Sequence, residues 1–132
     1  MKKKNIFKNV KSPLQIFKDH RGIISDIFYK EKYEHVTYIK TKPNKIRGNH
    51  YHKKTTQATF VINGKLEYYY KKIKSKKITK IVLKAGDLIV SPPYEIHAMK
   101  TLKKSCDFLA FAKGPRGAKD YEKDTFRIKI IH

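Results

Sequence analysis

The sequence predicts an all-β protein, a small barrel or sandwich of short strands. Three observations indicate this fold: short runs of β-branched and aromatic residues, turn signals between the runs, and few stretches with helical periodicity. Strands at such short spacing favour a sandwich or a barrel. At 132 residues and 39% hydrophobic content, the chain has the size of one domain with a core of its own. We therefore expect a single domain over residues 1–132, with residues 1–12 either mobile or a swapped edge strand.

The expected strands follow one another closely along the chain. They cover residues 23–29, 35–39, 58–62, 66–70, 78–83, 88–90, 99–102, 107–111 and 126–130. The early ones are rich in isoleucine, valine, threonine and aromatic residues, and the last alternates apolar with basic residues, as a half-buried strand does.

Turn residues separate these strands. Asn63 and Gly64 predict a two-residue hairpin turn, because both central positions of that turn need positive φ. Residues 74–77 are polar and predict a hairpin tip. Pro92 ends the strand before it, since proline cannot donate to the ladder. Residues 114–117 predict a loop.

The net charge of +21 suggests a nucleic-acid partner, but the distribution of this charge argues against one. Only four of the 32 basic residues are arginine, the residue that gives bidentate contacts to bases and phosphates. The lysines are spread over almost every segment. We therefore expect no nucleic acid, and instead an anionic small molecule whose encounter with the protein the positive field accelerates.

The sequence also shows no export or membrane signal. The basic N-terminus is not followed by an apolar h-region, and no apolar run approaches the roughly 20 residues of a membrane helix. The single cysteine, Cys106, precedes an apolar run, which predicts a buried thiol. We expect a cytoplasmic protein that does not bind membranes.

Two histidines, His50 and His52, are the most informative residues of the chain. On a β-strand, side chains two residues apart lie on the same face. A third, His97, follows a second strand-and-turn segment. Imidazoles that converge inside a small barrel can bind a metal or move protons. The other histidines have no such pattern, and we expect them at surface or terminal positions: His20, His35 and His132.

Two motifs around these histidines resemble those of the cupin family. The order His50-x-His52, four residues, Gln57, six residues and Gly64 resembles the first cupin motif, with Gln57 in place of the usual glutamate. The order Gly86, five residues, Pro92 and then His97 resembles the second cupin motif. Tyrosine at 94 and threonine at 101 stand where cupins often have glycine and asparagine. This resemblance implies a single-domain cupin, a jelly roll or β-barrel.

Three short segments narrow the resemblance to sugar-nucleotide cupins: residues 19–22, 47–53 and 120–121. They look most like the 3,4-ketoisomerases of dTDP-4-keto-6-deoxyglucose, which share the arginine-glycine-x-His-x-His-lysine run and carry glutamine where this chain has Gln57. The related dTDP-sugar 3,5-epimerases (RmlC-like) generally lack the second histidine. The resemblance implies a homodimer, a dTDP-linked 4-keto-6-deoxyhexose as substrate, and a place in deoxysugar biosynthesis for bacterial surface polysaccharide.

The implied reaction moves a carbonyl from C4 to C3 of the hexose. It requires loss of the C3 proton, an enediol intermediate, and return of a proton at C4. Histidine, with an unperturbed pKa of about 6.5, suits both transfers. We expect His50 and His52 to be the catalytic base and proton donor, in an order that the sequence leaves open, and no cofactor.

Five further residues are expected to bind the substrate. Arg47 is a candidate for holding the diphosphate through charge-assisted bonds. Tyr38 either donates to the sugar oxygen or fills barrel volume. Arg21 either contacts the nucleotide or diphosphate, across a dimer interface, or stabilises a turn. Gln57 and His97 complete the set, and His97 is expected to line the pocket.

Three other functions stay open. A dTDP-4-keto-sugar 3- or 3,5-epimerase begins with the same kind of deprotonation. A metal-binding cupin would use His50, His52, Gln57 and His97, although the neutral Gln57 amide lacks the negative charge of the usual carboxylate. A non-catalytic module that binds a sugar nucleotide or nucleic acid is the third.

Overall fold

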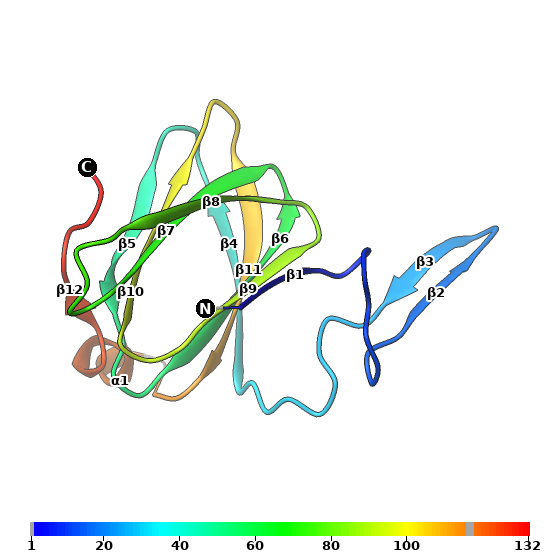
Figure 1. Ribbon diagram of the computed structural model, residues 1–132, viewed down its shortest axis with the longest axis horizontal. Helices are drawn as coiled ribbons and strands as arrows, with labels where there is room; N and C mark the ends of the chain where they lie inside the picture. The colour runs from blue at the N-terminus through cyan, green and yellow to red at the C-terminus, as the bar shows by residue number, and fades with distance from the viewer. Residues whose placement is uncertain (1, 116–117) are drawn as a thin grey trace.

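The structure, a computed structural model, describes residues 2–115 and 118–132. The described residues form a chain of short strands with one short helix (Figure 1). In order they are β1 (Lys2–Asn5), β2 (Ile16–Asp19), β3 (Gly22–Ser25), β4 (His35–Thr41), β5 (Ile46–Tyr51), β6 (Thr56–Asn63), β7 (Lys65–Lys72), β8 (Thr79–Lys84), β9 (Asp87–Ser91), β10 (Glu95–Thr101), β11 (Cys106–Lys113), α1 (Ala118–Lys123) and β12 (Phe126–Arg127).

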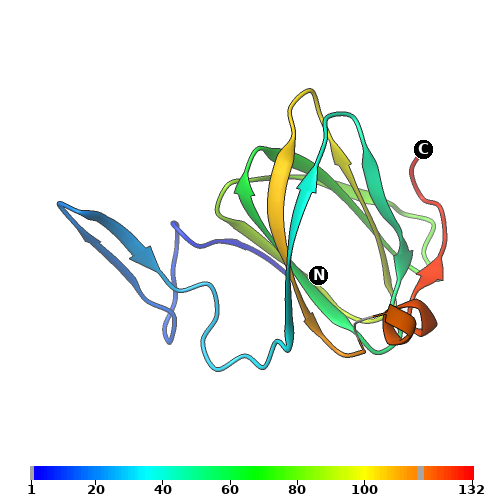
Figure 2. The ribbon, with the colours of Figure 1, turned by 180° about the vertical axis from the view of Figure 1, so that it is seen from behind.

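Two five-stranded antiparallel sheets make up the body of the protein. One has the order β1-β9-β6-β11-β4 and the other β12-β5-β10-β7-β8. The two sheets curve around a common interior, as Figures 1 and 2 show. The fold is therefore all-β, as the sequence predicts. Strands β2 and β3 pair only with each other, and this hairpin projects away from the barrel in both views.

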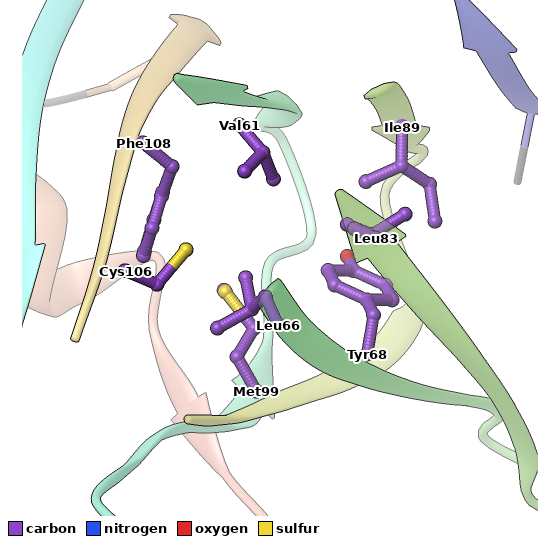
Figure 3. Packing of buried hydrophobic residues seen from close by; sticks show 8 residues of the cluster. All are labelled: Val61, Leu66, Tyr68, Leu83, Ile89, Met99, Cys106 and Phe108. Carbon is purple, nitrogen blue, oxygen red and sulfur yellow. The ribbon is translucent and has the colours of Figure 1, made fainter. Parts of the chain in front are cut away.

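An apolar cluster fills part of the barrel interior (Figure 3). Its buried members come from both sheets: Val61, Leu66, Tyr68, Leu83, Ile89, Met99, Cys106 and Phe108. The prediction of a buried thiol is confirmed, since Cys106 is fully buried and burial raises its pKa to about 11. This packing fixes which face of each strand points inward.

Most of the expected strands are present with shifted ends. The segments 35–39, 58–62, 66–70, 88–90 and 107–111 lie within β4, β6, β7, β9 and β11. The polar tip at 74–77 joins β7 to β8, which pair as a hairpin. The expected strand 23–29 ends at Ser25, and 126–130 is a strand only over its first two residues. The expected loop at 114–117 is described only as far as Pro115.

The prediction of a hairpin at Asn63 and Gly64 is wrong, because β6 and β7 belong to different sheets. Only Gly64 has a positive φ, of 83°. An added Cβ there would lie 2.5 Å from the backbone oxygen of Ser105, so the chain can make this sharp corner only with glycine. Asn-Gly serves here to cross from one sheet to the other.

The ends of the chain pack onto the edges of the two sheets. Strand β1 pairs antiparallel with β9 of the same protomer. In the other sheet, β12 pairs with the edge of β5. The residues after β12 are hydrogen-bonded to Asn49 of β5. The Asn49 side chain accepts hydrogen bonds from the amides of Ile130 and Ile131, at 2.9 and 3.1 Å. Among the described residues, no helix has the length and apolar character needed to cross a membrane.

Candidate functional site

Three histidine rings meet inside the barrel. His50 comes from β5, His52 follows the end of that strand, and His97 comes from β10. The ring centroids lie 4.9 Å apart for His50 and His52, 4.8 Å for His50 and His97, and 5.6 Å for His52 and His97. One ring nitrogen from each lies within 4.8 Å of the others. The structure thus brings together the two residues expected to be catalytic and the third expected to line the pocket.

The strands themselves create this convergence. His50 is the register partner of His97 across the antiparallel pair β5 and β10, and directly opposed residues share a face. His52 lies one residue beyond β5, where its backbone oxygen accepts a hydrogen bond of 2.7 Å from the amide of Tyr94. That bond ties the end of the first motif to the turn that precedes β10.

The ring of His52 has a defined orientation. Its Nδ1 lies 2.8 Å from the backbone oxygen of Asp124, and both groups are buried. Because a carbonyl can only accept, Nδ1 carries the proton of this bond. In the neutral ring, Nε2 then holds the lone pair. Nε2 of His52 is buried, and no partner for it exists within residues 2–115 and 118–132.

Asp124 also holds the main chain that follows His52. Its carboxylate accepts hydrogen bonds from the amides of Lys53 and Lys54, at 3.0 and 3.1 Å, and from the Thr55 hydroxyl at 2.7 Å. Burial opposes the charged form, but these hydrogen bonds together outweigh it and lower the pKa of Asp124. One residue therefore fixes both the ring of His52 and the backbone behind it.

His97 is the most enclosed of the three rings, at 1% exposure. Burial, followed by the neighbouring His50 and His52, lowers its pKa to about 3, so the ring is neutral at physiological pH. Tyr68 stacks on it at 6.2 Å between ring centroids, and the Tyr68 hydroxyl bonds to Ser91. In the described part of the chain neither nitrogen of His97 has a hydrogen-bond partner.

These orphaned nitrogens distinguish this part of the barrel from the apolar cluster. Buried polar atoms normally have partners, so several orphans at one place point to a ligand, an ion or water that would satisfy them. Thr59, on the inward face of β6, adds a buried hydroxyl with no partner in the ranges that the structure describes.

Arg47 shares the inward face with His50 because β5 carries a bulge. The register shifts between His97 and Ala98, so that Met99 opposes Arg47 while His97 opposes His50. Met99 belongs to the interior cluster, and its partner therefore lies on the same side of the sheet. The Arg47 Nε donates to the Thr41 hydroxyl at 2.7 Å and its Nη2 to the Lys40 backbone oxygen at 3.4 Å, while the residue as a whole is exposed.

Glycine makes this bulge possible. Gly48 has a φ of 88°, and an added Cβ would lie 2.8 Å from the backbone oxygen of His97 and 3.0 Å from the Cα of Ala98. Strands β5 and β10 therefore approach each other more closely there than any side chain would allow.

Gln57 lies on the facing sheet. It is 6% exposed and occupies β6 two positions before Thr59 and four before Val61, on the inward side. Its register partner on β9 is Ser91, which links it through Tyr68 to the stacked ring of His97. Gln57 thus lies in the same polar region of the interior as the histidines.

Two of the expected substrate-binding residues lie elsewhere. Tyr38 is on the outward face of β4, 57% exposed, with its hydroxyl bonded to Asp107. Arg21 is at the tip of the β2–β3 hairpin, where it forms an ion pair of 2.6 Å with Asp19. Within one protomer, the structure does not bring either residue to the histidine cluster.

Two neighbours of His52 had no assigned role in the sequence. Asp124 follows α1, and Tyr121, within that helix, has its ring 5.6 Å from the ring of His52. Tyr121 belongs to one of the segments that carry the family resemblance, and this was its only sequence signal. Asp124 had none, since its partner is 72 residues away in the chain.

The arrangement can perform one of two kinds of chemistry. A neutral imidazole with a fixed tautomer and a free lone pair can accept a proton from a bound molecule. Three imidazole nitrogens at this spacing can also coordinate a transition metal.

Several solved structures have a similar fold. QdtA, a sugar 3,4-ketoisomerase from Thermoanaerobacterium thermosaccharolyticum solved in complex with TDP, is 22% identical with a TM-score of 0.71, over 86% of this chain and 83% of that one. A dTDP-4-dehydrorhamnose 3,5-epimerase from Elizabethkingia anophelis is 14% identical with a TM-score of 0.74, over 92% and 79%.

A longer protein is also similar. The capsular polysaccharide assembling protein CapF from Staphylococcus aureus is 19% identical with a TM-score of 0.66 over 89% of this chain. This chain covers 35% of CapF, about a third of its length. Among curated proteins, none matches the sequence.

These likenesses show that the fold is an RmlC-like cupin, as the two histidine motifs predict. The family of the protein is identified from its sequence. The model of the polysaccharide biosynthesis C-terminal domain matches residues 17–107, more than half of the chain. This protein therefore belongs to the polysaccharide biosynthesis C-terminal domain family.

Proposed function

We propose that this protein is a sugar-nucleotide isomerase, a 3,4-ketoisomerase of a dTDP-linked 4-keto-6-deoxyhexose. The observation that carries the proposal is the meeting of three histidines in which one ring, His52, has its lone pair fixed on a buried nitrogen. The similar structures include a ketoisomerase with TDP-4-keto-6-deoxyglucose and an epimerase with dTDP-4-keto-L-rhamnose. Both ligands are nucleotide-linked keto sugars.

In this proposal Nε2 of His52 accepts the proton from C3 of the sugar. The neighbouring ketone acidifies that proton, and the C4 oxygen takes up a proton as the enediol forms. The C3 hydroxyl then loses its proton while C4 gains one, so the carbonyl moves and no atom is gained or lost. In the same proposal, His50, whose ring centroid lies 4.9 Å from that of His52, delivers the proton at C4.

His97 has a different role. Because burial keeps its ring neutral, one nitrogen can donate a hydrogen bond to a sugar oxygen while the other accepts one. Such donors, held in place before the substrate binds, stabilise the charge that develops on the enediol oxygens. Gln57, on the facing sheet, can donate through its amide in the same way.

Arg47 supplies the positive charge for the diphosphate. It lies on the same face as His50, three residues earlier, and its side chain is exposed although it bonds to Thr41 and to the Lys40 backbone oxygen. A sugar ring at the histidines would extend its diphosphate along the strand toward this group. Bidentate, charge-assisted bonds from arginine suit such an oxyanion.

We further propose that two protomers complete the enzyme. An isolated two-stranded hairpin is marginal in water, and β2–β3 exposes Phe17 at 58%, Ile23 at 52% and Ile24 at 70%. A second copy that covers these side chains would give the hairpin a third element to pack on. Arg21 at its tip could then contact the nucleotide of the partner. The setting of this activity would be deoxysugar biosynthesis for surface polysaccharide, in the cytoplasm.

The decisive experiment uses dTDP-4-keto-6-deoxyglucose in deuterated water. Our proposal expects a C3 ketone and deuterium at C4, located by NMR. Retention of the C4 ketone with exchange at C3 or C5 would instead establish an epimerase, and unchanged substrate would leave only a binding function.

A metal-binding cupin is the second candidate, and the cluster geometry favours it. Three nitrogens within 4.8 Å, two of them on buried rings, fit the ligand set of zinc, iron, copper or nickel. His50, His52 and His97 would hold the ion, which would act as a Lewis acid on the sugar oxygens. Gln57, being neutral, adds no charge to hold it. Elemental analysis of protein purified without chelator decides: near-stoichiometric metal supports this candidate, and turnover that survives exhaustive chelation excludes it.

A further inference from the structure

A hollow of about 970 Å³ lies at the end of the barrel opposite α1. Four connections between strands surround it: those of β4–β5, β6–β7, β8–β9 and β10–β11. The β4–β5 and β10–β11 connections lie at that end in both views (Figures 1 and 2). Its volume falls in the range of small-molecule sites.

Five lysines line this hollow: Lys65, Lys84, Lys100, Lys103 and Lys104. Among the described residues, no acidic side chain lines it. Two other hollows of the described chain, of about 610 and 450 Å³, also have several lysines, but Asp26 and Asp87 line the first and Glu31 the second. A high lysine content alone therefore does not explain the absence of acidic residues here.

The lysines of the hollow form no close ion pairs within the described ranges. Glu67, the acid opposite Lys100, is near enough for Lys100 to help lower its pKa, but its ion pair is with Lys80. Lys65 and Lys84 are direct register partners on β7 and β8. Like charges that face each other across a strand pair destabilise a sheet. An anion bound between them would remove this repulsion.

Hydrogen bonds join two of the connections around the hollow. The Thr101 hydroxyl donates to the Lys42 oxygen at 2.6 Å and accepts from the Lys45 amide at 2.9 Å. The Asn44 amide donates to the Leu102 oxygen at 2.9 Å. These bonds fasten the β4–β5 connection to the end of β10, next to Lys100.

We propose that this hollow binds a compact oligophosphate, an anion with two or more adjacent phosphoryl groups. Lysine ammonium groups neutralise such charge as points, without a required geometry. A hollow lined by one sign of charge also concentrates the opposite ion. Single-stranded nucleic acid fits less well, because no aromatic side chain from residues 2–115 and 118–132 lines the hollow to stack on bases.

The site is distinct from the histidine cluster. His97 and Thr101 both point inward from β10, four residues apart, which is about 13 Å along a strand. The hollow contains none of the residues to which the isomerase proposal assigns a role. The anion-site proposal and the isomerase proposal can therefore be tested independently.

Calorimetric titration with inorganic tripolyphosphate tests the inference. We expect saturable binding of one anion per protomer to the wild type. The triple variant Lys65→Gln/Lys103→Gln/Lys104→Gln should bind at least about tenfold more weakly, because three of five charges are gone. The matched control Lys74→Gln/Lys76→Gln/Lys77→Gln removes the same charge from the β7–β8 tip and should change affinity by less than about threefold.

Two results would overturn the inference. One is equal weakening in both triple variants, or no saturable binding, since the net charge alone would then explain any attraction. The other is loss of tripolyphosphate binding in Arg47→Gln with binding retained in the lysine triple variant, which would place the anion at Arg47 and not in this hollow. Turnover of the keto sugar by the lysine variant, measured in parallel, reports on the isomerase proposal independently.

Discussion

The ring nitrogen Nδ1 of His52 lies 2.8 Å from the backbone oxygen of Asp124. A backbone oxygen cannot change its role, so the bond persists in the neutral ring and leaves the lone pair on the buried Nε2. Asp124 is in turn held by the residues that directly follow His52. Most of the expectations below depend on this reciprocal arrangement.

Replacement of either proton-transfer histidine should abolish most turnover while leaving ligand binding. We expect His50→Asn and His52→Asn each to lower kcat by about 10²–10⁴-fold, the usual contribution of a general acid or base. Thymidine diphosphate affinity, measured by calorimetry, should change little. The control is His35→Asn, a histidine outside the cluster. Loss of nucleotide affinity in step with kcat would mean that the two histidines only maintain the fold.

Removal of the Asp124 carboxylate should reduce both stability and turnover. Asp124→Ala leaves the Lys53 and Lys54 amides and the Thr55 hydroxyl without their acceptor, at a cost of about 1–3 kcal/mol for each group that stays buried. Asp124→Asn retains one acceptor oxygen and should lose less. Urea unfolding and kcat, measured for both variants, check this order.

The same carboxylate should contribute to acid unfolding. Its pKa is lower in the folded protein than its ordinary value of 3.8, so the unfolded chain binds its proton first. The stabilisation is present above about pH 4 and disappears as pH falls through the lowered value. Stability of Asp124→Asn should therefore fall less steeply than that of the wild type below pH 4. Parallel slopes would show that other carboxylates dominate there.

His97 should make stability depend on pH in a higher range. Its pKa is about 3 in the folded protein against 6.5 for the ordinary residue. Between these values the unfolded state binds one proton more, so the free energy of unfolding falls by about 1.4 kcal/mol for each unit of decreasing pH. The stabilisation is complete above pH 6.5. His97→Gln should flatten this part of the stability profile, and an unchanged slope would contradict the low pKa.

Gly48→Ala should disturb the site from a distance. Its Cβ would meet the His97 backbone oxygen at 2.8 Å, and its φ of 88° strains any L side chain. We expect a loss of about 1–3 kcal/mol in stability and a rise in KM, because the bulge keeps Arg47 on the face of His50. Gly22→Ala is the control, since Gly22 has a φ of 140° but nothing within 4 Å of the added Cβ.

The sequence predicted the barrel and its histidines for local reasons. The β-branched and aromatic residues of β6 and the second histidine motif at β10 carry their signals within a few residues. Helix α1, with six residues, is too short for a periodic pattern. Strand β5, with charged and glycine residues, has no β-branched run beyond its first residue.

Features that depend on distant partners could not be predicted. Asn63 and Gly64 have the residues of a hairpin, but β6 and β7 pair with strands of different sheets, so the chain turns a corner there instead. Whether the Tyr38 side chain points inward or outward depends on which β4 residues pack against the core. Asp124 reaches its partners across about 70 residues, so nothing adjacent to it marks its role.

Asn49 has a consequence beyond the site. A sheet edge with open amide and carbonyl groups is a template on which strands of other molecules can add. The short strand β12 covers only Tyr51 and His50, and the Asn49 carboxamide continues that cover by gripping the backbone of Ile130 and Ile131. The Asn49 side chain thus helps to prevent strands of other molecules from pairing with this edge of the sheet. Asn49 is next in sequence to His50, a residue expected to be catalytic.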